Sequence, residues 1–173
     1  IAAIARPRIT NFALLLDYAS NPLLVSRVKG ITDPTGVVTD QVYFHVDATF
    51  AIFDRLALNI DIPAAVMNDG KDPVYRGTTF SSPHNPAFGD LRLGLRARLF
   101  GEQTDLFQIG VQGFVWAPTG SRSDFTGDGE AHGMPQLVLG GFHDRFVWSF
   151  SGGAHIRPTT TFNNVNIGSS VEL

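Results

Sequence analysis

Three arginines alternate with apolar residues in segment 90–100, which reads D-L-R-L-G-L-R-A-R-L-F. Because successive side chains of a strand point to opposite faces, Arg92, Arg96 and Arg98 share one face and the leucines share the other. A row of charged side chains that lines a pore can select ions or small polar solutes. The same charges, paired with acids, can instead fill a narrow interior and block it.

Acidic and histidine side chains that could pair with these arginines lie on the polar faces of other alternating segments. His45 and Asp47 lie in one segment, Asn59 and Asp61 in the next, and a further histidine lies near the C-terminus. The segment with Asp61 should neighbour the arginine segment, so we expect Asp61 to meet an arginine across the strand pair. We therefore predict a charge network on one face, made of His45, Asp47, Asp61, Arg92, Arg96, Arg98 and His155. Sequence alternation leaves open whether this network conducts or plugs, since a barrel of about eight strands is just wide enough for side chains to fill.

Metal binding and catalysis find little support in the sequence. Segment 121–133 gathers carboxylates in a Gly-rich loop, which would suit calcium, but its spacing does not match the EF-hand loop. We expect a solvated acidic loop there, and no metal or cofactor. Motifs of the G-x-S-x-G and H-E-x-x-H types are absent, and His155 near Ser149 and Ser151 is the one set comparable to a barrel-rim active site. We expect the protein not to be an enzyme.

The bulk composition is that of one β-rich domain spanning residues 1–173, with 18 glycines, 14 phenylalanines and no cysteine. The net charge of −3 is not the excess of positive charge that is typical of nucleic-acid-binding proteins, so we expect no nucleic-acid partner. No apolar run is long enough for a membrane-spanning helix. A spanning β-strand needs only about 9–11 residues, and half of them can be polar. Residues 1–7 lack the features of a signal peptide, so an export signal would have been removed beforehand.

Eight segments alternate with period 2 and position the charged residues. They are 12–18, 41–53, 56–64, 90–100, 106–117, 136–142, 146–157 and 165–173. Short polar turns alternate with long loops at 20–40, 66–89 and 118–135, as in outer-membrane barrels. The pattern predicts an all-β, up-and-down antiparallel transmembrane β-barrel of at least eight strands.

Several aromatic residues lie beside the predicted turns, where outer-membrane barrels carry girdles at the two membrane interfaces. An alternative is that they are ordinary core aromatics of a soluble sandwich. Their placement favours the girdle, and we assign to it Phe53, Phe100, Phe142, Phe146 and Trp148.

Three stretches carry a family resemblance: T-D-Q-V-Y-F-H-V-D-A-T-F-A-I-F-D-R-L-A-L-N-I-D-I-P, F-G-D-L-R-L-G-L-R-A-R-L-F-G and V-W-A-P-T-G-S. The chain from about residue 14 to 173 resembles the β-barrel domain of OmpA-family outer-membrane proteins of the myxobacterial type. Such proteins usually carry a periplasmic peptidoglycan-binding domain after the barrel, and this sequence has none. It also lacks the terminal aromatic residue that usually closes such barrels. We therefore expect either part of a larger barrel of about twelve strands or further residues beyond position 173.

The resemblance implies a structural or anchoring protein of the bacterial outer membrane with limited passage of small solutes. Its partners would be outer-membrane lipid and other envelope proteins. Two alternatives stay open at this point: an open porin-like channel or transporter with an arginine-lined lumen, and a soluble β-barrel or sandwich that binds a ligand.

Overall fold

The structure is a computed structural model, and all the secondary-structure elements in its described part are β-strands. It describes residues 8–25, 35–52, 54–75, 78–79, 81–83, 85–102, 104–162 and 165–172. Nowhere in these ranges does a helix occur that is long and apolar enough to cross a membrane.

One antiparallel sheet contains most of the strands. Its main path runs β1-β2-β3-β7-β8-β9-β10-β13. From β1 to β10, neighbours in the sheet are successive long strands of the chain, and the three-residue β13 follows β10. The strands of this path are β1 (Arg8–Val25), β2 (Thr35–Ile52), β3 (Leu56–Asp69), β7 (Leu91–Phe100), β8 (Gln108–Ala117), β9 (His132–His143), β10 (Phe146–His155) and β13 (Ser170–Glu172). The short β6 (Ala87–Phe88) adds to β3. This order confirms the predicted all-β, up-and-down antiparallel fold class.

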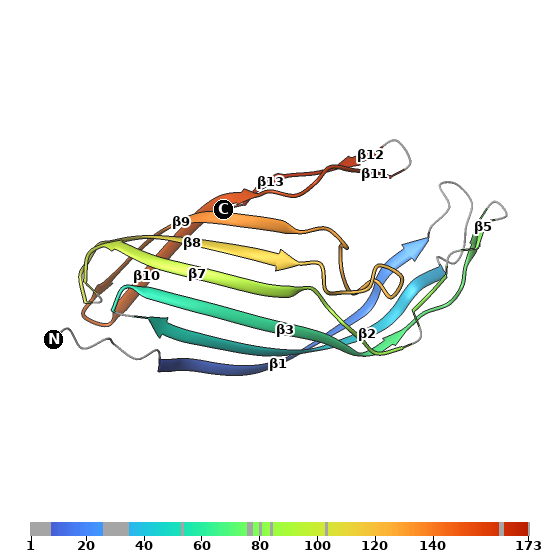
Figure 1. Ribbon diagram of the computed structural model, residues 1–173, viewed down its shortest axis with the longest axis horizontal. Coiled ribbons are helices and arrows are strands. Elements are labelled where there is room, and N and C mark those ends of the chain that lie inside the picture. The colour runs from blue at the N-terminus through green and yellow to red at the C-terminus, as the bar shows by residue number, and fades with distance from the viewer. Residues whose placement is uncertain are drawn as a thin grey trace.

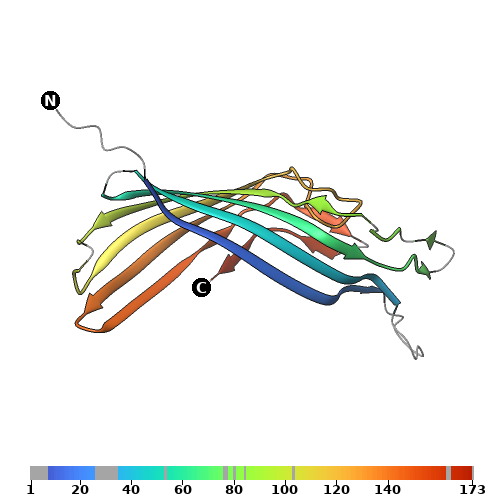
Figure 2. The same cartoon turned by 90° about the horizontal axis from the view of Figure 1, so that it is seen from below.

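The sheet curls across its width into a half-barrel (Figures 1 and 2). Among the described residues, β1 pairs only with β2, and β13 pairs only with β10 through three residue pairs. Two small hairpins stand apart from the main sheet: β4 (Val74–Tyr75) with β5 (Thr78–Thr79), and β11 (Thr160–Phe162) with β12 (Val165–Ile167).

Short and long connections fall at opposite ends of the strands, as the sequence predicts. The turns that join β2 to β3, β7 to β8 and β9 to β10 gather at one end, called here the short-turn end (Figure 1). The β9–β10 turn is the tightest, and Asp144 adopts a left-handed φ of 52° in it. The connections from β3 to β7 and from β8 to β9 lie at the other end, called here the loop end.

Strand boundaries differ from the predicted ones mainly at the loop end. Strands β1, β2, β3 and β9 all continue into stretches that composition marks as loop, because their hairpin pairing persists there. The predicted last strand, 165–173, is wrong as a single element. It is divided between β12, which pairs with β11, and β13, which pairs with β10.

The register sorts side chains into a polar concave face and an apolar convex face. Asp47, Asp61, Arg92 and Trp116 form one row across β2, β3, β7 and β8. Contacts between strands that are not neighbours form on this face: Arg92 of β7 reaches Asp47 of β2 at 3.6 Å. The convex face carries large apolar side chains that nothing in the described structure covers. Its members include Phe12, Leu14, Leu16, Ile62, Leu93, Leu95, Val111, Val115, Leu137 and Phe150.

Candidate functional site on the concave face

A chain of charged side chains crosses four strands in the middle of the concave face. Asp47 and Asp61 lie directly opposite each other across β2 and β3, an arrangement of like charges that is destabilising on its own. Arg92 offsets it, since its Nη2 lies 3.4 Å from Asp61 Oδ2 and 3.6 Å from Asp47 Oδ2. Asn59 also donates to Asp47 Oδ2 at 2.8 Å.

His45 extends this chain toward β1. Its Nδ1 lies 3.2 Å from Asp61 Oδ1, and its Nε2 lies 3.5 Å from Asp17 Oδ2. The network thus contains three carboxylates and one guanidinium, which leaves two negative charges unbalanced when His45 is neutral and one when it is protonated. The sequence places Asp17 in the first segment without linking it to this network.

An aromatic ring packs beside the chain. The Arg92 guanidinium lies 5.3 Å from the centroid of Phe114, which is within cation–π range. Phe114 lies opposite Gly94 in the β7–β8 register, and a Cβ at Gly94 would come within 2.9 Å of the ring. The glycine therefore makes room for the phenyl group on the concave face.

Arg96 and Arg98 share the concave face with Arg92 but do not join its network. Arg98 lies near the short-turn end, where its Nη2 donates to the Asp54 carbonyl at 3.0 Å and lies 3.6 Å from Glu102 Oε2. Within the described residues, Arg96 makes no hydrogen bond or ion pair. The predicted seven-residue network is therefore divided, because residues on one face still differ in their height along the strand.

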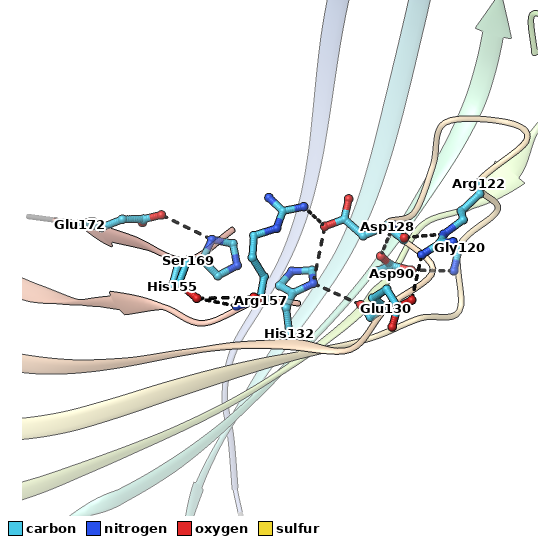
Figure 3. A network of polar contacts seen from close by, with 10 residues as sticks. All are labelled: Asp90, Gly120, Arg122, Asp128, Glu130, His132, His155, Arg157, Ser169 and Glu172. Atoms are coloured by element: carbon cyan, nitrogen blue, oxygen red, sulfur yellow. Dashed lines mark hydrogen bonds and ion pairs between the residues drawn. The ribbon is translucent and has the colours of Figure 1, made fainter. Parts of the chain in front are cut away.

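His155 belongs to a separate cluster near the loop end (Figure 3). Its ring centroid lies 4.9 Å from that of His132 and 5.5 Å from that of Trp116, and His132 stacks on Trp116 at 4.8 Å. The Nδ1 of His155 lies 3.6 Å from Glu172 Oε1. Its partners are thus aromatic rings and a glutamate, and neither Ser149 nor Ser151 bonds to it in the described structure.

The acidic loop between β8 and β9 is held in place by Asp90, a residue that no motif or charge pattern of the sequence singles out. Asp90 Oδ1 accepts from Gly120 N and Oδ2 accepts from Asp128 N, both at 2.8 Å (Figure 3). A Cβ at Gly127 would come within 2.5 Å of Asp90 Oδ1, so the loop backbone passes tightly over this carboxylate. The one signal in the sequence is the position of Asp90, immediately before the strand.

The same loop reaches across to β3. Asn68, which is buried, donates its Nδ2 to the Asp124 carbonyl at 2.7 Å, and Thr126 Oγ1 donates to the Phe88 carbonyl at 2.8 Å. A hollow of about 460 Å³ remains between the loop and the concave face, and Tyr43 and Trp116 are among the residues that line it. The loop therefore covers part of the loop end of the half-barrel.

The loop acids are occupied by arginines and hydroxyl groups. Arg122 Nη2 lies 3.2 Å from Glu130, Arg157 Nη2 lies 2.8 Å from Asp128, and Ser121 Oγ donates to Asp124 at 2.6 Å. The described residues include no cluster of three or more side chains suited to hold a metal ion.

The predicted girdle aromatics gather at the short-turn end but divide between the faces. Phe100 and Phe146, 61% and 66% exposed, lie on the convex face. Trp148 lies there too, where it packs near Phe107 and donates its Nε1 to the Leu106 carbonyl at 3.2 Å. Phe142 pairs with Val147, which places both on the concave face by alternation and removes Phe142 from the convex set. Phe53 lies outside the described residues.

The fold and this site define an all-β, up-and-down half-barrel with a charged concave face and an apolar convex face. No family model, curated protein or solved structure matches the chain.

Proposed function

We propose that this protein is an outer-membrane β-barrel protein of a Gram-negative bacterium, with a structural or anchoring role. The observation that carries the proposal is the exposed apolar convex face. Leu16, Leu95, Val115 and Phe150, each from a different strand, are 69%, 54%, 54% and 54% exposed. Monomeric soluble proteins rarely expose apolar patches that extend so far, whereas lipid-facing strands must carry them.

The charged concave face supports the same proposal. Charged side chains are costly in contact with lipid and are found facing the interior of membrane barrels. A soluble sandwich would bury its apolar face against a second sheet and expose its polar face. In the described residues the apolar face has no second sheet against it, which argues against a soluble sandwich.

The backbone imposes a further requirement on this proposal. In hydrocarbon each strand edge must be paired, because an unsatisfied N–H or C=O costs several kcal/mol there. The outer edge of β1 and the edge of β13 must therefore be paired in the membrane.

The structural role, with limited passage of solutes, is supported by how the concave face is filled. The charged side chains of Asp17, His45, Asp61 and Arg92 contact one another in turn and occupy the middle of the concave face. The loop held by Asp90 covers part of the loop end. Side chains and a loop that fill an interior restrict what can pass through it.

Purification with and without detergent tests the membrane assignment. We expect the protein to aggregate when detergent is removed and to fold again when lipid vesicles are supplied. A folded monomer that persists in aqueous buffer without detergent contradicts the proposal.

An open channel is the second candidate, and Arg96 is the observation that favours it. This guanidinium lies on the concave face with no countercharge among the described residues, beside a hollow of about 380 Å³. Conductance in planar bilayers separates the structural role from the channel role, because a protein with a filled interior should pass no measurable ionic current. Steady conductance with anion preference that falls in Arg96→Gln would support the channel.

A further inference from the structure

We propose that the hollow at the short-turn end of the concave face is a binding site for a small oxyanion of the phosphate, sulfate or carboxylate class. This inference goes beyond the membrane role and stands on the concave face alone, so it does not depend on the proposed function.

Small inward-facing residues create the hollow. Four inward positions at this end hold small residues: Ala51 of β2, Ala57 of β3, Gly110 of β8 and Gly140 of β9. Together with larger residues such as Arg96, Gln108 and Val138, they line a space of about 380 Å³. Nearer the middle of this face, the inward side chains of Gln112 and Gln136 meet and share a hydrogen bond. The space at the short-turn end is therefore large enough for a solute.

Guanidinium groups dominate the charge of the lining. Arg55, Arg96 and Arg98 line the hollow with a single carboxylate residue, Asp54. Glu102 lies outside the lining and engages Arg55 at 2.6 Å and Arg98 at 3.6 Å, so it balances part of this charge. No acidic side chain pairs with Arg96 within the described structure, so its positive charge is not balanced by a neighbour.

A second observation points to a missing acceptor. The Nε of Arg98 is buried and has no hydrogen-bond partner in the described structure. The Nε of Arg92 is also unpartnered, but Arg92 already meets two carboxylates through its Nη2, whereas Arg98 lines the hollow. Buried donors are rarely left unsatisfied, and each exception needs an explanation. An oxyanion in the hollow offers several acceptor oxygens to guanidinium N–H groups, which bind such oxygens through short charge-assisted hydrogen bonds.

Arg92 shows why the site forms at this height and not in the middle of the sheet. Arg92 already meets two carboxylates, at 3.4 and 3.6 Å. Arg96 lies opposite Ala57 on β3 and Gln112 on β8, neither of which carries charge. The same strand thus presents one neutralised and one available guanidinium.

Isothermal titration calorimetry tests the site, with inorganic phosphate added to the detergent-solubilised protein. We expect saturable binding that Arg96→Gln weakens about tenfold or more, the scale of one charge-assisted hydrogen bond. Ala57→Leu should weaken it too, by filling the space while leaving every charge in place. Sulfate should compete with phosphate, and chloride at the same ionic strength should compete far less.

Arg122→Gln is the matched control, since it removes one positive charge at the opposite end of the sheet. It should bind phosphate like the wild type, and an equal loss in both variants would show unspecific charge attraction and overturn the site. Absence of saturable binding in the wild type, with circular dichroism showing a folded sheet, would also overturn it. Failure of the membrane proposal looks different: a protein that is soluble without detergent could still bind phosphate.

Discussion

Asp47 and Asp61 face each other directly across β2 and β3, and both carboxylates lie within 3.6 Å of the same guanidinium, that of Arg92. Two acids placed opposite each other repel, so this pair depends on the arginine that the next strand supplies. The concave face is held together at its centre by this dependence.

Removing the Arg92 charge should therefore destabilise the sheet. We expect Arg92→Gln to lower the free energy of unfolding by about 1–3 kcal/mol, because it leaves two partly buried carboxylates without their cation. Urea unfolding in detergent micelles measures the loss. Arg96→Gln, on the same strand and face, should cost less than about 0.5 kcal/mol, since surface changes away from special contacts are small.

Relief of the repulsion gives an internal check on this explanation. Asp47→Asn in the Arg92→Gln background should restore part of the lost stability. A double variant less stable than Arg92→Gln alone would mean that the carboxylate pair is not the source of the effect.

Gly94 and Gly113 should differ in how well they tolerate the same substitution. A Cβ at Gly94 meets the Phe114 ring at 2.9 Å, whereas nothing lies within 4 Å of a Cβ at Gly113. Both glycines lie in strands, so the backbone contribution of a Gly→Ala change is similar in the two. We expect Gly94→Ala to be about 1 kcal/mol less stable than Gly113→Ala, the scale of overpacking by one methyl group. Equal stabilities in urea titrations would show that the ring moves aside freely.

Asp90 should control the order of the loop between β8 and β9. Asparagine offers one acceptor oxygen where the carboxylate uses two, so Asp90→Asn loses one of the bonds to Gly120 and Asp128. We expect trypsin to cleave after Arg122 about tenfold faster, as local opening becomes easier. Glu130→Gln, which weakens only an exposed ion pair to Arg122, should change the rate little.

A charge on the convex face should be tolerated only if that face meets water. Leu95→Arg should cost about 2–4 kcal/mol for folding into vesicles if Leu95 lies near the midplane. Val74, which is 64% exposed in the loop-end hairpin, provides the control, because Val74→Arg should cost little. Equal, small effects of both changes on folding into vesicles would argue that Leu95 does not contact lipid.

Side-chain alternation is sufficient to predict the sheet and its two faces, but not the heights of residues within a face. The pairing of Asp61 with Arg92 can be predicted because the two residues lie on successive strands of the up-and-down sheet, β3 and β7, which are neighbours. Arg96 lies four residues further along the same strand, and the register carries it away from every acid of the network. Such offsets depend on turn lengths and on bulges, such as the register shift between Val42 and Tyr43.

The loop contacts could not be predicted because they have no period. Asp90 holds Gly120 and Asp128, which lie 30 and 38 residues away, through backbone N–H groups that leave no trace in residue type. Similarly, His155 lies on the expected face, but its contact with His132 could not be predicted. His132 belongs to a stretch whose composition indicates a loop, whereas in the structure it is the first residue of β9.

The two tryptophans of the chain allow the most direct test of the central claim, that the convex face meets lipid and the concave face does not. Trp148 lies on the convex face, and Trp116 lies on the concave face against His132. Trp116→Phe and Trp148→Phe leave one fluorophore each, and each variant is folded into vesicles of lipid brominated near the headgroup. We predict strong quenching of Trp148 in the first variant and weak quenching of Trp116 in the second. Equal quenching of both residues, or stronger quenching of Trp116, would contradict the account.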